Sequence, residues 1–358
     1  MQILLVISSM GIGGEQRAAS IITDYLVKQR NHVTVLTFDA SQKTKIPFNP
    51  SIPILVIDKS KSNIYRLKSI RKEIYQKAYD VIVGFAVIPS VLCALSAIGS
   101  NIPVIVCERN DPDVYPKLWK FVRSVAYKFA AGAVFQTNDA SQYFSNQYFR
   151  NRVVIPNPVR TDIKKYRKAV KDRDPIIVNT SRLTEAKNQI QIIQAFSKIS
   201  NIYPNYTLDL YGDGVCGEKI RSLINELNLA EKVHLHHAQN NIFSQISNSQ
   251  IFVLASAHEG YPNSLAEAMA LGIAPISVNC RIGGPKDMIE NGINGILIPL
   301  NDEKSMIEAM QYLISNEIER NRISENAMKL ADKLCISNIG KQWSDFIQEI
   351  IEQNDKKD

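Results

Sequence analysis

The sequence predicts an α/β protein made of two doubly wound domains, each with a parallel sheet covered by helices on both faces. Three observations support this fold class. The chain has 358 residues, which suits two cores of about 150 residues better than one. Short apolar runs alternate with helical patterns. A proline-punctuated segment at 154–159 separates two such series, so we expect domains at 1–158 and 159–339, followed by a C-terminal helix at 340–358.

The expected strands are short apolar runs bounded by turn residues. They lie at 3–7, 33–38, 54–57, 81–85, 103–107 and 132–135 in the first half, and at 176–180, 207–211, 233–236, 251–255, 276–278 and 296–298 in the second. After about residue 302 the pattern is helical to the end. Its last part carries an apolar stripe formed by Trp343, Phe346, Ile347 and Ile350.

One stretch raises the alternative of a membrane span. Residues 81–99 contain no charge and approach the length that crosses a bilayer. Gly84 and Pro89 divide this stretch into a strand-length and a helix-length piece, which favours a buried strand and helix.

The compartment is expected to be the cytoplasm. The apolar run at 3–7 has no preceding positive region and is typical of a first strand rather than a signal peptide. The five cysteines are odd in number, scattered and form no C-x-x-C pair, so we expect neither a disulfide framework nor a zinc site.

The positive charge is concentrated in the first half. Residues 1–158 hold 19 Lys+Arg against 10 Asp+Glu, a net charge of +9, so the whole-chain value of +7 leaves −2 for the rest. Two basic stretches with apolar residues at helical spacing, 59–77 and 117–128, are expected either to lie on an anionic membrane surface or to be solvated surface helices. No nucleic-acid-binding motif accompanies the charge.

A pair of glutamates, Glu259 and Glu267, is the most informative feature. They are separated by seven residues at an expected strand-to-helix turn, where ligand crevices open in α/β sheets. The free N–H groups of a helix starting near Ser264 suit a phosphate. Ser264-x-x-Glu267 is equally a capping box, in which Glu267 only satisfies a backbone donor. Glu259 has no such capping role.

The segment 259–270 resembles the E-x7-E signature of family 4 glycosyltransferases, which are retaining enzymes with the two-domain GT-B fold. The likeness is dense from about residue 176 to 300 and sparser before it. It is carried further by Ser181–Asn188, Tyr211–Gly214, Gly283–Pro285 and Asn291–Gly295, and in the first half by Gly13–Glu15, Glu108–Pro112 and Val154–Val159. In this fold the last helix crosses back onto the first domain.

The resemblance implies roles in binding a nucleotide-sugar donor. Glu259 would bind the sugar hydroxyls and steady the oxocarbenium, and Glu267 would hold the ribose. Arg182 and Lys187 would neutralise the pyrophosphate, in place of a metal ion; the alternative for these cations is a surface pairing with Glu185. The remaining donor-binding residues implied are Gly13, Gly14, Gly212, Gly260, Tyr261, Pro262, Asn263, Ser264 and Leu265.

Three residues after the strand at 103–107 are candidates for the acceptor side. Many relatives carry a sugar-contacting histidine about here, whereas this chain has Glu108, Arg109 and Asn110. We expect these residues to contact the acceptor; an ion pair that ties down the loop is the alternative.

Three other motifs are set aside. The glycine loop at 11–16 has Gln16 where a dinucleotide fingerprint needs its third glycine. Asp111-Pro112-Asp113 has a central proline and no further acids, which disfavours a metal grip. Strand alternation places His234 and His236 on one face and His237 on the other, which argues against a metal site shared by the three.

The sequence is therefore interpreted as a retaining glycosyltransferase that needs no metal cofactor. It would move a hexose or N-acetylhexosamine, most simply from a UDP-sugar, to a saccharide acceptor. A polyprenyl-diphosphate-linked acceptor at the inner face of a membrane, in cell-surface polysaccharide assembly, and an N-acetylgalactosamine-transferase-like branch are expected. The alternatives are a glycoside hydrolase using Glu259 and Glu267, and a non-catalytic nucleotide-sugar-binding partner.

Overall fold

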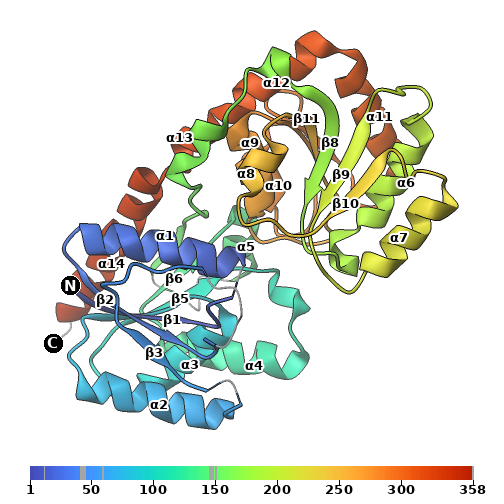
Figure 1. The fold of residues 1–358 in the computed structure, drawn as a ribbon. Helices are drawn as coiled ribbons and strands as arrows, with labels where there is room; N and C mark the ends of the chain where they lie inside the picture. The colour runs from blue at the N-terminus through green and yellow to red at the C-terminus, as the bar shows by residue number, and fades with distance from the viewer. Residues whose placement is uncertain (12, 41–45, 59, 145–148, 150, 357–358) are drawn as a thin grey trace. The chain divides into compact units, whose positions relative to one another are not determined.

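The computed structural model describes residues 1–11, 13–40, 46–58, 60–144, 149 and 151–356. The chain divides into two compact units (Figure 1). Unit 1 consists of Met1–Pro158 together with Leu334–Asp358, and unit 2 of Val159–Lys333. The C-terminal segment therefore packs with unit 1 from Leu334 onward, earlier than the expected residue 340.

Unit 1 is built on a seven-stranded parallel sheet with the order β3-β2-β1-β4-β5-β6-β7. Its strands are β1 (Gln2–Ile7), β2 (His32–Thr37), β3 (Ile54–Val56), β4 (Val81–Gly84), β5 (Val104–Glu108), β6 (Gly132–Phe135) and β7 (Asn151–Val154). The central strands are apolar on both faces because helices cover both sides of the sheet. β7 is not among the expected strands: it is a short edge strand that contains an exposed arginine, Arg152.

Helices cover both faces of the first sheet (Figure 1). They are α1 (Gly14–Lys28), α2 (Asn63–Gln76), α3 (Val87–Ser96), α4 (Lys117–Ala126), α5 (Asn138–Tyr143) and α14 (Ile336–Asp355). The stretch 81–99 thus forms β4 and α3. Within the described residues, no helix combines the length and apolar composition that a membrane crossing needs.

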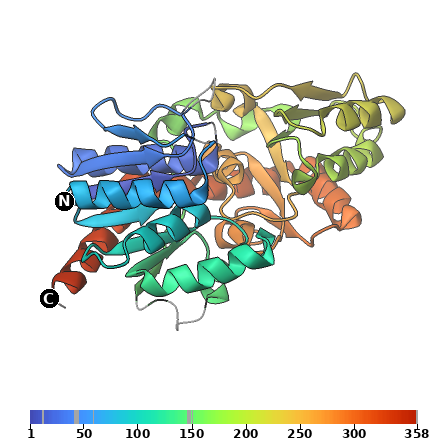
Figure 2. The same cartoon turned by 90° about the horizontal axis from the view of Figure 1, so that it is seen from below.

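The C-terminal helix α14 belongs to the core of unit 1, and Figure 2 shows it in red beside that unit. Trp343 is buried, and its ring centroid lies 5.5 Å from that of Phe85. Gly340 packs so closely on the Tyr25 ring of α1 that a Cβ there would lie 2.4 Å from the ring. The apolar stripe expected at 340–352 is therefore what attaches the helix.

Unit 2 contains a six-stranded parallel sheet with the order β10-β9-β8-β11-β12-β13. Its strands are β8 (Asp174–Thr180), β9 (Thr207–Tyr211), β10 (Val233–His236), β11 (Ser249–Leu254), β12 (Ala274–Val278) and β13 (Ile296–Ile298). Two doubly wound parallel sheets confirm the predicted fold class. In each sheet the strand order reverses beside the first strand, and parallel sheets leave a crevice at such a point.

The helices of unit 2 also lie on both faces of its sheet (Figure 1). They are α6 (Gln189–Ile199), α7 (Gly217–Glu226), α8 (Ile242–Ile246), α9 (Asn263–Leu271), α10 (Gly284–Met288), α11 (Glu303–Ser315), α12 (Glu317–Met328) and α13 (Leu330–Lys333). Helices α6, α7 and α11 pack on one face through Phe196, Ile220 and Leu313, which join the main hydrophobic core of the unit.

Candidate active site

The two loops that face each other at the reversal point of the second sheet follow β8 and β11. These strands are direct neighbours, but β8 leads toward β9 on one side, while β11 leads toward β12 on the other. The N–H of Ala257 donates to the carbonyl of Ala186 at 2.8 Å, which joins the two loops. This arrangement brings together residues 181–188 and 255–262, the two segments that carry the predicted donor-binding side chains.

Lys187 and Glu259 form an ion pair between these loops. The Lys187 Nζ lies 2.5 Å from Glu259 Oε1, and the side chains are only 18% and 12% exposed. Lys187 thus pairs with Glu259 and not with Glu185. Glu259, which has no capping role in the sequence, has a partner far along the chain. A cation and a carboxylate held side by side can bind a phosphate and a hydroxyl respectively.

A buried amide network holds the loop after β8. Asn188 adopts the left-handed conformation with φ of 50° and precedes α6. The side chain of Gln189 donates to Ser181 Oγ at 2.7 Å and to the Arg182 carbonyl at 2.9 Å. Gln189 is a positioning residue that the sequence did not single out, because a glutamine at the start of an amphipathic helix carries no distinctive signal. The Arg182 side chain is exposed near the start of this loop.

Glu267 is not part of a capping box, so that interpretation is wrong. Helix α9 begins at Asn263, its N-cap is Pro262, and the cap makes no side-chain hydrogen bond. Ser264 therefore lies inside the first turn, beyond the position that a capping residue occupies. Glu267 is a buried carboxylate one turn further along the same helix. With the capping box excluded, the ribose contact that the family resemblance implies remains the prediction for Glu267.

Two glycines allow the neighbouring loops to approach the site. A Cβ on Gly212, after β9, would lie 1.9 Å from the Ser181 carbonyl oxygen. A Cβ on Gly284, after β12, would lie 1.9 Å from the Gly260 carbonyl oxygen. Both contacts are with rigid backbone, so only glycine is tolerated without movement. Gly212 thus packs on the start of the loop after β8, and Gly284 packs on the loop after β11, next to Glu259 in the chain.

Cys280 also lies beside Glu259, at the end of β12. Burial, with a further contribution from the Glu259 carboxylate, raises the pKa of the Cys280 thiol to about 12. A thiol this weakly acidic is a poor nucleophile at neutral pH. The Cys280 thiol therefore carries little thiolate at neutral pH and adds no charge beside the Lys187–Glu259 pair.

In unit 1, Gly13 and Gly14 stand at the start of α1. Gly13 is the N-cap in an extended conformation, without a side-chain cap bond, and Gly14 is exposed. Ile12 lies outside the described residues. Glu15 accepts a hydrogen bond from Ser8 N at 3.0 Å; burial raises its pKa and Arg109 opposes that rise.

The predicted acceptor residues occupy different environments within unit 1. Arg109 lies over the Phe85 ring at 4.0 Å and donates to Asn157 in the linker, and burial lowers its pKa to about 10. Asn110 accepts from the N–H of Asp111 at 2.9 Å. Both are partly exposed, so both stay as candidates.

Glu108 does not fit the predicted set of acceptor-contacting residues. Its side chain is fully buried, accepts a hydrogen bond from Tyr127 Oη at 2.7 Å, and lies 3.5 Å from Arg123 Nη1. Burial raises the pKa of Glu108 to about 7, against the opposing effect of Arg123. Glu108 therefore forms the ion pair that ties down the loop, and its buried carboxylate is not available to an acceptor.

Both aspartates of the D-x-D motif at 111–113 accept hydrogen bonds from residues of unit 1. Asp111 accepts from the N–H of Asp113 at 2.9 Å, and Asp113 pairs with Lys120 and accepts from Tyr143, each at 2.8 Å. These contacts explain both carboxylates by local structure.

Comparison with known proteins identifies the family. The family described as "Glycosyl transferases group 1" matches residues 161–330, and that described as "Glycosyltransferase Family 4" matches residues 12–163. The chain is a family 4 glycosyltransferase. Membership makes the protein an enzyme of the glycosyl-transferring class 2.4 that takes a nucleotide-sugar donor, as the sequence predicted.

Relatives of this glycosyltransferase cover nearly its whole length. GalNAc-alpha-(1->4)-GalNAc-alpha-(1->3)-diNAcBac-PP-undecaprenol alpha-1,4-N-acetyl-D-galactosaminyltransferase of Campylobacter jejuni is 23% identical over 98% of this chain and 99% of its own. Anabaena HepE in complex with UDP superposes with a TM-score of 0.81 and 18% identity, over 98% of this chain and 100% of its own. Sucrose-phosphate synthase from Thermosynechococcus elongatus gives a TM-score of 0.84 at 15% identity, over 98% and 99%. These likenesses establish the GT-B fold.

Proposed function

We propose that the enzyme transfers a hexose or N-acetylhexosamine from a UDP-sugar, with retention of anomeric configuration and without a metal ion, to a saccharide linked to a polyprenyl diphosphate. The observation that carries this proposal is the Lys187–Glu259 pair at the reversal point of the second sheet. The Campylobacter relative, whose name contains an undecaprenol-diphosphate-linked acceptor, supports the acceptor class. The product would contribute to a cell-surface polysaccharide.

The charges at the pair match the demands of glycosyl transfer. When the glycosidic bond to UDP breaks, negative charge develops on the leaving diphosphate and positive charge on the sugar ring. Lys187, with the exposed Arg182, stabilises the first, so that no metal is required. Glu259 accepts hydrogen bonds from sugar hydroxyls and stabilises the second. Donor binding replaces the contact between Lys187 and Glu259 with these two separate contacts.

The start of α9 completes the donor site in this proposal. The backbone N–H groups of Asn263, Ser264 and Leu265 point from the positive end of the helix, where a phosphate is stabilised. Glu267, buried one turn later, binds the ribose hydroxyls. Gly13 and Gly14 of unit 1 contribute to donor binding through backbone at the start of α1.

Two measurements test the reaction type. Transfer from a panel of UDP-sugars to lipid-linked saccharides should proceed at full rate in EDTA, and NMR of the product should show the anomeric configuration of the donor. Inversion, or a rate lost in EDTA and restored by Mg²⁺, would overturn the proposal. Hydrolysis of an aryl glycoside without any nucleotide would favour a glycoside hydrolase instead.

A membrane surface is the proposed location, and α4 is the element that supports it. Leu118 and Phe121 are 72% and 67% exposed, and Val125 and Phe129 continue the same row, which we name the α4 stripe. Exposed Lys117 and Lys128 lie at its two ends. An apolar row flanked by cations suits the inner face of an anionic membrane.

The other basic stretch, 59–77, packs partly into the core of unit 1. Ile70 and Ile74 of α2 are buried inside unit 1, whereas Ile64 at the start of the helix is 70% exposed, so only part of the apolar face that the sequence offered to a membrane is accessible. Lys59, which the sequence counts among these cations, lies outside the described residues.

Vesicle sedimentation tests this location. The protein should pellet at low salt with phosphatidylglycerol-containing vesicles, and the double variant Leu118→Ser/Phe121→Ser should lose most of that binding. Ile318→Ser is the matched control, because Ile318 is 84% exposed on α12 of unit 2. Equal pelleting of both variants would rule out the α4 stripe.

A further inference from the structure

A cluster of metal-ligating side chains lies at the edge of the second sheet. Strands β9 and β10 pair in parallel, with His234 opposite Asp209 and His236 opposite Tyr211. Residues two apart on a strand share a face, so Asp209, His234 and His236 all project from the same side. The alternate residues Leu208, Leu210 and Val233 enter the hydrophobic core on the other side. Strand alternation within 233–237 alone could not identify Asp209, because it comes from the neighbouring strand.

The three side chains already have the spacing of a metal-ligand set. His234 Nδ1 lies 2.9 Å and His236 Nε2 lies 3.7 Å from Asp209 Oδ1, and one ligand atom of each residue lies within 4.8 Å of the others. Ligand atoms bound to Zn²⁺ at about 2.0–2.1 Å in a tetrahedral site are roughly 3.3 Å apart. Small rotations of two imidazoles would reach that geometry.

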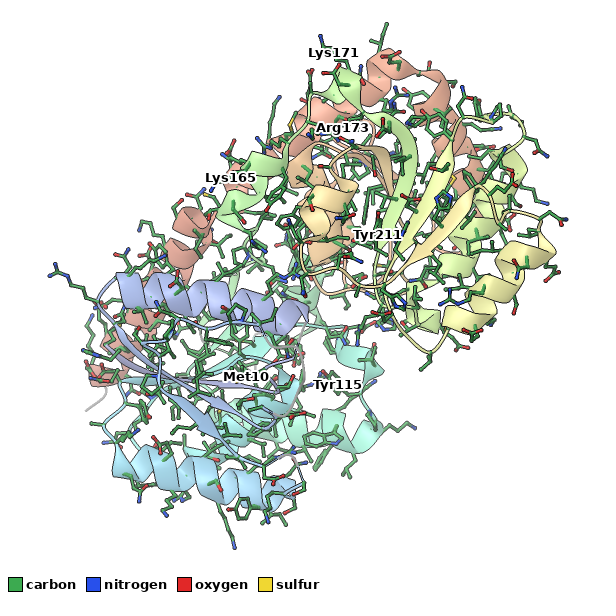
Figure 3. All side chains as sticks on the ribbon, in the orientation of Figure 1. Met10, Tyr115, Lys165, Lys171, Arg173 and Tyr211 are labelled. Carbon is green, nitrogen blue, oxygen red and sulfur yellow. The ribbon has the colours of Figure 1, made fainter. Side chains whose placement is uncertain are left out.

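His236 provides a second observation. Its Nε2 is shielded from solvent, yet it makes no hydrogen bond within the described part of the chain, although it faces the Asp209 carboxylate. A buried polar atom of this kind needs an explanation such as a bound ion. The Tyr211 ring, at the end of β9 (Figure 3), stacks on the His236 imidazole at 4.4 Å and 15°, which fixes the direction of that nitrogen.

We propose that Asp209, His234 and His236 bind one divalent transition-metal ion of the Zn²⁺ class. Two imidazoles and a carboxylate suit Zn²⁺, Co²⁺ or Ni²⁺ rather than Mg²⁺ or Ca²⁺. The side chains of His234 and His236 are 43% and 38% exposed, so an ion can enter and water can complete its coordination. This site is separate from Lys187 and Glu259 and takes no part in the transfer reaction.

The bound ion would crosslink β10 to β9. The N–H of Gly212 donates to the carbonyl of His236 at 3.0 Å, and Gly212 also packs on Ser181. A metal that fixes His236 to Asp209 therefore restrains the loop after β9. The expected consequence is a more stable unit 2, and not a new chemical step.

Metal titration of the full chain, without an oligohistidine tag, tests the site. After dialysis against EDTA, the protein should bind one Co²⁺ with visible d–d absorption, which Zn²⁺ should displace. Zn²⁺ in about hundredfold excess over its Kd should raise Tm by at least about 3 °C. Asp209→Asn and His236→Gln should each weaken Co²⁺ binding at least tenfold, while the Tm in EDTA reports whether the variants are folded.

The neighbouring Asp213–His237 pair supplies the control. His237 Nδ1 lies 2.6 Å from Asp213 Oδ1 on an exposed loop, but this pair offers only two ligands. His237→Ala should bind Co²⁺ like the wild-type protein. The proposal is overturned if the wild-type protein binds no Co²⁺ above the level of Asp209→Asn, or if His237→Ala loses binding to the same degree.

Discussion

The two units share one topology but use their charges differently. Each sheet reverses beside its first strand, at β1/β4 in unit 1 and at β8/β11 in unit 2. In unit 2, Lys187 and Glu259 form a partly exposed pair on two loops. In unit 1, the charged residue at the end of β5, Glu108, is buried against Arg123 and Tyr127. The same fold thus yields a partly exposed charge pair on two loops in one unit and a fully buried pair in the other, depending on whether the loop side chains stay accessible.

The largest expected effect comes from the pair in unit 2. Lys187→Ala should lower kcat/KM by about 10²- to 10³-fold, since it removes a cation that meets the leaving group. It should also weaken UDP binding by about 10- to 100-fold. Steady-state kinetics and UDP calorimetry measure both.

Glu259→Gln is the variant to compare with Lys187→Ala, because it removes the charge of the other member of the pair. It should lower kcat by a factor on the order of 10² while UDP binds as tightly as before or more tightly, because Lys187 loses its internal partner. Parallel loss of UDP affinity in both variants would mean that the pair is structural, as in unit 1.

The Glu108–Arg123 pair of unit 1 should affect how the stability of the protein depends on pH. Because the pKa of Glu108 rises from 4.5 to about 7 on folding, the folded protein binds more protons between these values, and stability falls as pH rises through that window. Glu108→Gln removes this dependence. Relative to wild type, the variant should gain up to about 3 kcal/mol between pH 4.5 and 7. The loss of Arg123's partner adds a cost that does not change with pH.

Urea unfolding at several pH values measures this difference, with Glu218→Gln as the control because the Glu218 side chain is 91% exposed. A difference between Glu108→Gln and wild type that stays constant with pH would show that Glu108 is ionised without penalty, and the contrast between the two units would weaken.

Glycine substitutions compare the loops of the two units. Gly212→Ala should cost about 1–3 kcal/mol of stability, because the new Cβ would meet the rigid Ser181 carbonyl. In unit 1, a Cβ on Gly13 would meet only the end of the flexible Gln16 side chain, and the φ of −172° suits any residue. Gly13→Ala should cost well under 1 kcal/mol. Similar losses of Tm in both variants would contradict this difference in packing.

The smallest expected effect concerns non-glycine residues whose backbone is in the left-handed conformation. Arg30 after α1 has φ of 64°, and Asn188 before α6 has φ of 50°. Arg30→Gly should stabilise the protein by about 0.5–1 kcal/mol, whereas Asn188→Gly should be nearly neutral, because asparagine tolerates this conformation. Thermal unfolding separates the two; a larger gain at Asn188 than at Arg30 would show that the active-site loop stores strain.

Much of the fold could be predicted from local pattern. Twelve of the strands follow apolar runs that a parallel sheet requires on both faces. The missed strand, β7, lies at an edge, where partial exposure permits Asn151 and Arg152 and removes the apolar signal. The helix boundary at Pro262 was also missed, because Ser264 and Glu267 have the spacing of a cap although the chain turns two residues earlier.

The sequence by itself determined the two-domain α/β class, the family, and the segments that carry the site, because these depend on periodicity and on motifs contiguous in the chain. Only the tertiary structure decided which charged side chains contact one another. Lys187 meets Glu259, Glu108 is buried with Arg123, and Asp209 joins His234 and His236. Each of these contacts depends on strand order, register or burial, which bring together residues that no local pattern relates.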